Sequence, residues 1–276
     1  MSFAWKKSAP KVAFITGGSS GIGFEFARLL AKEGCSVAIF NRRLAPAAVD
    51  ELAKLALTEQ QQFKSYAADV ADAESLSAAV VAAVAALGQP DLAINSAGIT
   101  ISKPFEALSA TEFSQVIKVN LIGSRNFADA VLPHLAQGSH LVFVASIAGL
   151  VSNYAYAAYC ASKFATVGLA SVLRLELKLK GIDVSVCCPA EIDTPLVVEE
   201  RKTLHPISAA LKDFVGTMGV EPACDSMMKQ IARRKFEIIP GVMARLSAAL
   251  NRHFPALTRW ISDLIAHRVM KRYNLK

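Results

Sequence analysis

The amino-acid sequence predicts an α/β fold in which one doubly wound parallel sheet carries helices on both of its faces. Three observations lead to this prediction. Short apolar runs alternate along the chain with longer amphipathic stretches, as strands alternate with helices around a parallel sheet. A glycine-rich turn joins the first apolar run to the first amphipathic stretch. The chain has 276 residues, of which 53% are hydrophobic, and α/β folds of about 250 residues commonly form one domain.

Each strand and each helix is expected from its own pattern. Strands are predicted where a short apolar run ends at a turn or a polar residue, at residues 12–16, 36–41, 62–68, 92–95, 140–146, 182–189 and 236–240. Helices are predicted where apolar residues recur at helical spacing, at residues 23–33, 45–57, 73–87, 111–135, 159–180 and 221–234. We therefore expect a single domain over residues 1–241, with ligands bound at the carboxyl ends of its strands.

The turn after the first strand predicts a binding site for a phosphate group. Its residues are Thr16, Gly17, Gly18, Ser19, Ser20, Gly21, Ile22 and Gly23. Glycines let the backbone approach a pyrophosphate closely, and the free N–H groups and dipole of the following helix attract negative charge. The spacing T-G-x-x-x-G-x-G differs from the commonest dinucleotide motif. The alternative is a glycine-rich turn that binds no ligand.

Tyr159 and Lys163 predict a centre that exchanges a proton with a carbonyl or an alcohol. A free phenol titrates near ~10, too high for ready proton exchange at neutral pH. A lysine four residues later lies on the same helix face, and its charge can lower that pKa. Ser146 can hold the substrate oxygen meanwhile. The alternative is an ordinary helix turn with a solvated lysine.

Taken together, the motifs resemble the short-chain dehydrogenase/reductase family over residues 11–240. The resemblance rests on short motifs in the family's order: Thr16-Gly17-x-x-x-Gly21-x-Gly23, Asp69-Val70, Asn95-Ser96-Ala97-Gly98, Asn120, Ser146, Tyr159 with Lys163, and Pro189 followed by Thr194. The sequence departs from the family at Ser96, where asparagine is usual, and at Ala190, where glycine is usual. Neither departure removes a catalytic side chain.

This resemblance implies a Rossmann fold and an oxidoreductase that acts on a ketone or a secondary alcohol. The implied catalytic residues are Asn120, Ser146, Tyr159 and Lys163, with Asn120 anchoring a water that links Lys163 to solvent. The implied cofactor-binding residues are Thr16, Gly17, Ser19, Ser20, Gly21, Ile22, Gly23, Asn41, Arg42, Arg43, Asp69, Val70, Asn95, Ala97, Gly98, Tyr159, Lys163, Pro189, Ile192 and Thr194. The implied substrate-binding residues are Ser146, Tyr154, Tyr156, Tyr159 and Leu196. A module that senses NADP without catalysis, or acts as a scaffold, is the alternative from another class, and its usual sign is a broken catalytic tetrad.

The end of the second strand predicts NADP(H) as the cofactor. A carboxylate at this position would bond the ribose diol and repel a 2′-phosphate, but the sequence has Asn41 there. Arg42 and Arg43 follow, and a guanidinium forms strong, often bidentate bonds to phosphate. The alternative is a solvated pair of arginines.

Three features concern the compartment. The five cysteines are not spaced like metal ligands, which argues against a metal site. Their odd number argues against a disulfide framework. Residues 130–162 contain no charged side chain except the histidines, but a membrane span is rejected because prolines, glycines and the predicted catalytic residues interrupt the stretch. The N-terminus lacks an apolar signal segment, so a cytoplasmic protein is expected.

Residues 195–219 predict an apolar lid over the substrate. The segment contains Leu196, Val197, Val198, Leu204, Ile207, Leu211, Phe214, Val215 and Met218. A small hydrophobic, lipid-like ketone is therefore favoured over a sugar. Residues 189–195 and 234–241 also resemble 3-ketodihydrosphingosine reductases, which implies a 3-keto long-chain base. A 3-oxoacyl thioester, a steroid and a small aromatic ketone stay open, as does simple packing of the lid against the domain.

Residues 242–276 predict a basic amphipathic helical tail. They carry seven basic side chains and one acidic residue, Asp263, against a net charge of +7 for the chain. After Pro255, apolar residues recur at helical spacing: Leu257, Trp260, Ile261, Leu264, Ile265 and Val269. Such a helix can lie on an anionic membrane surface, or its stripe can dock on the protein. Nucleic acid is not expected as a partner. By resemblance, a homodimer or homotetramer forms through the helices at 111–135 and 159–180.

Overall fold

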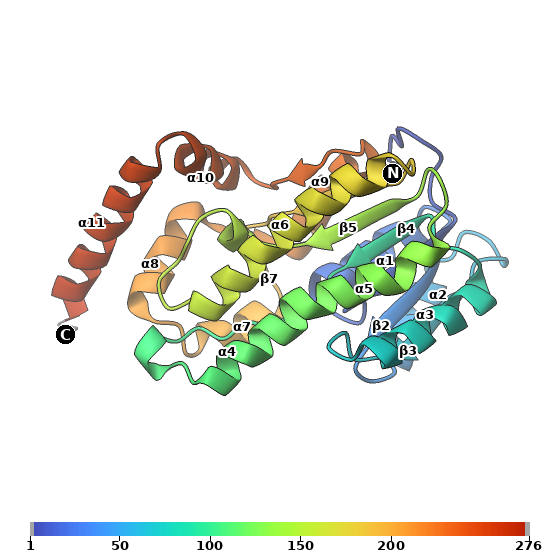
Figure 1. The fold of residues 1–276 in the computed structure, drawn as a ribbon, viewed down its shortest axis with the longest axis horizontal. Helices are drawn as coiled ribbons and strands as arrows, with labels where there is room; N and C mark the ends of the chain where they lie inside the picture. The colour runs from blue at the N-terminus through green and yellow to red at the C-terminus, as the bar shows by residue number, and fades with distance from the viewer. Residues whose placement is uncertain (1–2, 274–276) are drawn as a thin grey trace.

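The computed structural model describes residues 3–273 and has the predicted fold. Within these residues, seven parallel strands form one sheet in the order β3-β2-β1-β4-β5-β6-β9. Helices cover both faces of this sheet, so the doubly wound topology is confirmed (Figure 1). The strand order reverses between β1 and β4, and ligands of such sheets bind at the carboxyl ends next to the reversal.

The described strands are β1 (Val12–Thr16), β2 (Ser36–Asn41), β3 (Phe63–Ala67), β4 (Leu92–Asn95), β5 (His140–Val144), β6 (Asp183–Cys187), β7 (Glu191–Asp193), β8 (Thr217–Gly219) and β9 (Glu237–Ile238). The described α-helices are α1 (Gly21–Ala31), α2 (Pro46–Ala53), α3 (Ala73–Leu87), α4 (Ala110–Ile117), α5 (Gly123–Val131), α6 (Ala157–Lys178), α7 (Pro195–Arg201), α8 (Pro206–Val215), α9 (Val220–Ala232), α10 (Val242–His253) and α11 (Pro255–Tyr273).

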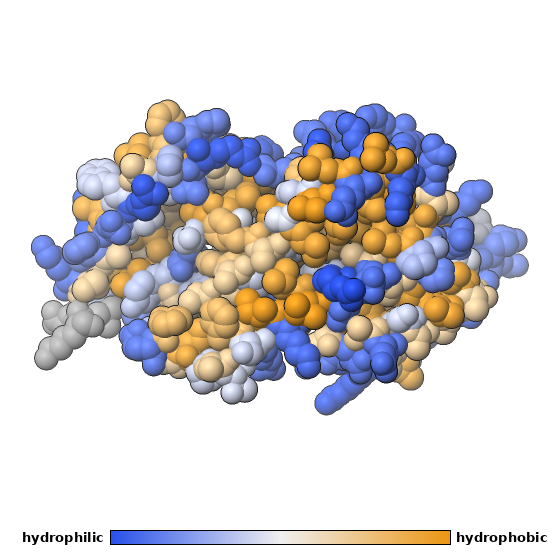
Figure 2. All heavy atoms as spheres, in the orientation of Figure 1, coloured by the Kyte–Doolittle hydropathy of each residue, from blue (hydrophilic) through white to orange (hydrophobic). Residues whose placement is uncertain are grey.

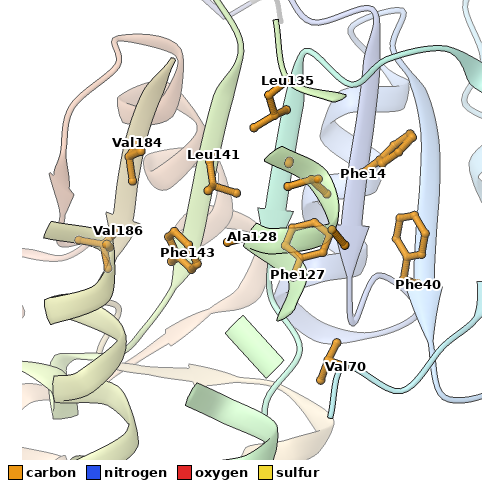
Figure 3. Packing of buried hydrophobic residues seen from close by; sticks show 14 of the residues in the cluster. Phe14, Phe40, Val70, Phe127, Ala128, Leu135, Leu141, Phe143, Val184 and Val186 are labelled. Atoms are coloured by element: carbon orange, nitrogen blue, oxygen red, sulfur yellow. The ribbon is translucent and has the colours of Figure 1, made fainter. Parts of the chain in front are cut away.

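One face of the sheet packs against α3, α5 and α6. Phe14, Phe40, Phe127 and Phe143 are fully buried there and interlock across neighbouring strands and α5 (Figure 3). Burying such a side chain stabilises the fold by about 1.5–3 kcal/mol. This cluster therefore fixes the positions of the helices that carry the candidate site.

The opposite face packs against α1, α2 and α9. Ile15 of the sheet contacts a cluster that includes Phe26 of α1, Leu52 of α2 and Met227 of α9, all fully buried. The strands are apolar on both sides because helices cover both faces. The alternation of apolar runs in the sequence therefore predicted this sheet well.

Four segments differ from the sequence-based expectation. The single helix expected at 111–135 is interrupted by a π-helical turn, Lys118–Ile122. The lid is not a plain segment, because β7 and β8 pair in parallel as a small second sheet around α7 and α8. The strands expected at 182–189 and 236–240 are shorter, at Asp183–Cys187 and Glu237–Ile238.

The tail forms two helices that break next to Pro255, as predicted. Helix α10 packs on the domain through Ala244 and Ala248, and Asn251 Nδ2 donates a hydrogen bond to the carbonyl of Leu150 at 2.8 Å. Helix α11 lies at one end of the molecule beside α8 (Figure 1). No helix among the described residues is long and apolar enough to cross a membrane.

Candidate active site

The glycine turn after β1 has a backbone that only glycine allows. Gly17 and Gly21 have φ of +65° and +54°, a left-handed conformation that side chains disfavour. A Cβ on Gly23 would lie 2.4 Å from the carbonyl oxygen of Gly17. Ser20 gives α1 no side-chain cap, so N–H groups of the first turn remain for an anion. These features form a cradle for a pyrophosphate.

Hydrogen bonds lock this turn to the neighbouring strand ends. Thr16 Oγ1 donates to Asn95 Oδ1 at 2.9 Å and accepts from the backbone N–H groups of Ser96 and Ala97. Asn95 Nδ2 donates to Ser124 Oγ at 2.7 Å. Thr16 and Asn95 are both buried, so their polar groups need these partners. The two residues thus hold the glycine turn against the loop that follows β4.

Asn41 stands at the end of β2, as expected for a residue that reads the adenosine ribose. Its Oδ1 accepts from the backbone N–H of Ser19 at 3.1 Å. Its Nδ2 is buried, yet it has no hydrogen-bond partner among residues 3–273. Such a group is costly to leave unpaired, and a ribose or phosphate oxygen would satisfy it. Arg42 and Arg43 beside it are exposed.

Most of the other predicted cofactor residues line one of two adjoining cavities. Ser20, Gly21, Ile22, Gly98, Thr194 and further turn residues line one cavity together with Tyr159 and Lys163. Pro189 and Ile192 line the adjoining cavity. Asp69 is exposed and accepts from the N–H of Ala71, whereas Val70 is buried in the core against Gly123. The adenine contacts of Asp69 and Val70 stay predictions.

Tyr159 and Lys163 lie one turn apart on α6 at the carboxyl end of β5, where Lys163 is buried and Tyr159 is half-buried. Lys163 Nζ donates to the carbonyl of Val144, the last residue of β5, at 3.0 Å. The same nitrogen lies 5.5 Å from the centre of the Tyr159 ring. Burial lowers the pKa of Lys163 to about 8, because the ammonium loses its hydration.

The expected lowering of the Tyr159 pKa is absent in this structure. Burial raises the pKa of the Tyr159 phenol, the hydrogen bond with Ser146 lowers it, and the negative charge of Glu200 raises it further. The prediction from Tyr159 and Lys163 alone was wrong in sign because it ignored the cost of placing a phenolate in an apolar environment. The phenol therefore keeps its proton and is ready to act as an acid.

Asn120 lies in the π-helical turn between α4 and α5. Its side chain is pinned on both sides: Oδ1 accepts from the N–H of Ile99 at 2.8 Å, and Nδ2 donates to Ser162 Oγ at 3.0 Å. The inserted residue of a π-turn re-aims the backbone, and such turns are frequent at functional sites. Gly98 lies between Asn120 and Lys163, since a Cβ there would be 3.3 and 3.6 Å from their polar atoms. The water relay through Asn120 stays a prediction.

A second, mostly apolar cavity meets the first at Tyr159. Ser146, Tyr156, Tyr159 and Leu196 line it, as predicted. Tyr154 was also expected to line the cleft or to pack, and it lies outside this lining. Its ring is instead 39% exposed and lies 4.7 Å, centre to centre, from the ring of His205.

Sequence reasoning missed a buried ionic cluster in the lid. Glu191 of β7 accepts hydrogen bonds from Arg201 of α7 and Thr217 of β8, and Lys212 of α8 lies 3.0 Å from it. Burial raises the pKa of Glu191, but the hydrogen bonds and the charge of Lys212 lower it more, so the net shift is downward. Breaking a buried pair of this kind costs about 3–5 kcal/mol. The cluster therefore ties the lid elements together.

The C-terminal tail contributes to the apolar cavity, so the alternative that its apolar stripe docks on the protein holds for part of the stripe. Thr258, Ile261 and Ile265 of α11 line this cavity with Leu250 of α10. The apolar stripe of α11 is therefore divided between two environments. Ile261 and Ile265 are half-buried against the lid, whereas Leu257 and Trp260 are exposed.

Comparisons with known proteins agree with this geometry. The family model described as short chain dehydrogenase matches residues 11–205. The chain is 31% identical to 3-dehydrosphinganine reductase of Danio rerio over 86% of this chain and 73% of that protein. It is 35% identical to D-threitol dehydrogenase of Mycolicibacterium smegmatis over 75% of this chain and 79% of that protein. A solved short chain dehydrogenase/reductase of Burkholderia phymatum in complex with NAD is similar with a TM-score of 0.76, at 25% identity over 90% of this chain and 94% of that one.

Proposed function

Because this chain belongs to the short-chain dehydrogenase family, we propose that it uses NADPH to reduce a hydrophobic ketone, a 3-keto long-chain base, to the secondary alcohol. The observation that carries this proposal is the junction of two cavities at Tyr159. One cavity contains the glycine turn and Lys163, and the other is lined mainly by apolar side chains. A nicotinamide dinucleotide suits the first, because the cradle and the unpaired Asn41 Nδ2 match phosphate and ribose oxygens.

The four catalytic side chains have distinct tasks in this proposal. When bound, the nicotinamide supplies a hydride to the carbonyl carbon. Tyr159 gives its proton to the carbonyl oxygen, and Ser146 donates a hydrogen bond to that oxygen and stabilises its developing charge. The Lys163 ammonium bonds the ribose hydroxyls and stabilises the phenolate that remains on Tyr159. Asn120 holds the loop at Ile99 and anchors the water that returns a proton to Lys163.

The preference for NADPH rests on the end of β2. Asn41 brings no negative charge, and Arg42 and Arg43 supply two exposed guanidinium groups for a 2′-phosphate. Steady-state kinetics with NADPH and NADH test this preference. We expect NADPH to be favoured and Arg42→Asp to reverse the order. Equal or faster turnover with NADH by the unaltered protein would contradict the preference.

The lipid-like substrate is supported by the lining of the second cavity and by the relative from Danio rerio. Ile192, Leu196, Phe214, Ile261 and Ile265 make this lining apolar over most of its extent, which suits an alkyl chain better than a polyol. The relative named D-threitol dehydrogenase makes a polyol the rival substrate. The proposal is tested by incubating the protein with NADPH and either a 3-keto long-chain base or a four-carbon ketose. Reduction of the first and not the second is expected.

A peripheral position on an anionic membrane and a homo-oligomeric state complete the proposal. Trp260 and Leu257 are exposed on α11, where Arg259 and Arg268 lie on the same helix. This combination suits the headgroup region of a bilayer. On α6, Phe164, Val172 and Leu175 form an exposed apolar stripe that Leu179 continues directly after the helix, and this stripe is suited to a second copy of the chain.

A further inference from the structure

One corner of the substrate cavity is polar, although most of its lining is apolar. The hydroxyl of Tyr156 donates a short hydrogen bond to Glu200, and Thr100 Oγ1 lies 3.3 Å from the same carboxylate oxygen. The ring of Tyr156 is 5.8 Å from the ring of Tyr159, centre to centre. All four residues line the cavity, so this corner adjoins the place of the reacting carbonyl.

Glu200 shares its one cation with a second carboxylate. The second oxygen of Glu200 accepts from Lys212 at 2.7 Å, and Lys212 is shared with Glu191, which in turn binds Arg201. Arg201 also contacts Asp213 at 3.3 Å. Lys212 is thus shared by two buried carboxylates, and Glu191 has Arg201 as a second cation, whereas Glu200 has only its share of Lys212. Since the side chain of Glu200 is only 6% exposed, water compensates little of its charge, and another cation in the cavity would be attracted.

We propose that Glu200 binds the ammonium group of a 2-amino-3-ketone, on the carbon next to the carbonyl that Tyr159 protonates. This inference rests on the proposed function, because a 3-keto long-chain base carries its amine at that position. A carboxylate has about four lone-pair sites on its two oxygens, so Glu200 can accept from the ammonium at the remaining site while it keeps Tyr156, Thr100 and Lys212. The amine then orients the head of the substrate, and the alkyl chain follows the apolar lining toward α11.

Such a contact would decide specificity. A buried polar group that loses its substrate partner rejects the analogue that lacks it far more strongly than an apolar pocket rejects a shorter chain. The rival substrates weighed above, a polyol ketone, a 3-oxoacyl thioester and a steroid, have no such amine. Glu200 therefore separates the amino ketone from ketones of similar length.

The test compares two ketones of equal chain length, one with and one without the 2-amino group, in the full chain with NADPH. The unaltered protein should prefer the amino ketone in kcat/KM. Glu200→Gln keeps the size of the side chain and removes its charge. It should lower kcat/KM for the amino ketone by about 10- to 100-fold, the value of a hydrogen bond to a charged group, and change kcat/KM for the other ketone by less than about threefold.

Asp213→Asn is the matched control. It removes the same charge from the same cluster, but Asp213 is exposed and does not line the cavity, so the preference for the amino ketone should persist. An equal loss on both ketones in Glu200→Gln would overturn the inference and make Glu200 a lid residue only. The same holds if the unaltered protein shows no preference.

A binding measurement separates this inference from the proposed function. The affinities of the long-chain 2-amino-1,3-diol and of the diol without the amine are measured in the presence of NADP⁺, with no turnover. If neither ketone is reduced, the proposed function fails, and tighter binding of the amino diol that is lost in Glu200→Gln would still support the ammonium site. Equal binding of both diols would overturn it.

Discussion

The phenol of Tyr159 keeps its proton at neutral pH because burial and the nearby charge of Glu200 raise its pKa. A protonated phenol is the form that reduction of a carbonyl requires. The hydrogen bond with Ser146 lowers the pKa of this phenol, and Lys163 Nζ lies 5.5 Å from the centre of its ring. At the scale of single residues, the phenol is therefore in the form that can protonate a carbonyl oxygen.

Tyr159→Phe keeps the ring and removes the proton. We expect kcat to fall by about 10²–10⁴-fold, the usual worth of a positioned acid, while the dissociation constant of NADPH changes little. Single-turnover kinetics and NADPH fluorescence titration measure the two quantities. Near-normal turnover in this variant would show that another group supplies the proton.

The reduction should lose activity as the pH rises through about 8, the pKa of Lys163. The ammonium is present below this pH and stabilises the phenolate that forms on Tyr159, and its charge disappears above this pH. kcat/KM for the ketone should therefore be flat from pH 6.5 to 7.5 and then fall, approaching about tenfold per pH unit. In Lys163→Arg, whose guanidinium stays protonated, that inflection should vanish. An unchanged inflection in the variant would assign it to a different group.

Glu200 shows why part of the site could not be predicted from the sequence. It stands in the run Glu199, Glu200, Arg201 and Lys202, which is typical of a solvated helix face. Only the fold places Glu200 against Tyr156 and Lys212 in the cavity. The proposed catalytic residues could be named from the sequence because their spacing is local or matches a family motif, whereas this carboxylate is defined by contacts between distant segments.

At the scale of secondary-structure elements, segments with a strong apolar periodicity could be predicted from the sequence, and local irregularities could not. The strands of the main sheet are apolar on both faces, so each appears as a distinct run. The chain is helical on both sides of the π-turn Lys118–Ile122. The one-residue insertion therefore hardly changes the spacing of apolar residues in the sequence. Strands β7 and β8 have three residues each, which is too short for an alternating pattern.

The apolar residues of α11 lie in two environments, the cavity and the exposed surface. The sequence indicated the apolar stripe of this helix but not that the stripe is divided between them. Ile261 and Ile265 line the substrate cavity. Trp260, which is 61% exposed, and Leu257 lie outside that lining. A membrane surface at Trp260 would bring the acyl phase next to the wall of the cavity.

The exposed residues of α11 give a prediction for membrane binding. The unaltered protein should co-sediment with vesicles that contain anionic lipid at low salt and be released at high salt, because basic side chains are attracted to anionic headgroups. Leu257→Ser combined with Trp260→Ser should abolish this binding. Val81→Ser, an exposed apolar position on α3, is the control and should bind normally. If the unaltered protein stays in the supernatant at low salt, α11 is a wall of the site only.

At the scale of the whole molecule, apolar side chains gather on the surface over the C-terminal half of α6 (Figure 2). Leu175 and Leu179 there are 63% and 93% exposed. An isolated protein seldom leaves a contiguous apolar surface of this kind uncovered. A symmetric pair of α6 helices would bury the stripe in both copies.

Sedimentation velocity at micromolar concentration should therefore show a dimer or tetramer. Leu175→Glu places a charge in the centre of the stripe and should shift the protein toward monomers. Leu57→Glu, at a similarly exposed position outside the helices, should leave the assembly intact. A monomer of the unaltered protein at this concentration would contradict the proposed interface.

The central claim is that the junction at Tyr159 reduces a long-chain ketone with NADPH. Initial rates of NADPH oxidation along a series of 2-amino-3-ketones of rising chain length test it most directly. Burial of each methylene contributes about 0.8 kcal/mol, so kcat/KM should rise by up to roughly fourfold per carbon until the chain fills the apolar cavity. NADPH oxidation that does not depend on chain length, or that occurs only with short polyol ketones, would contradict the account.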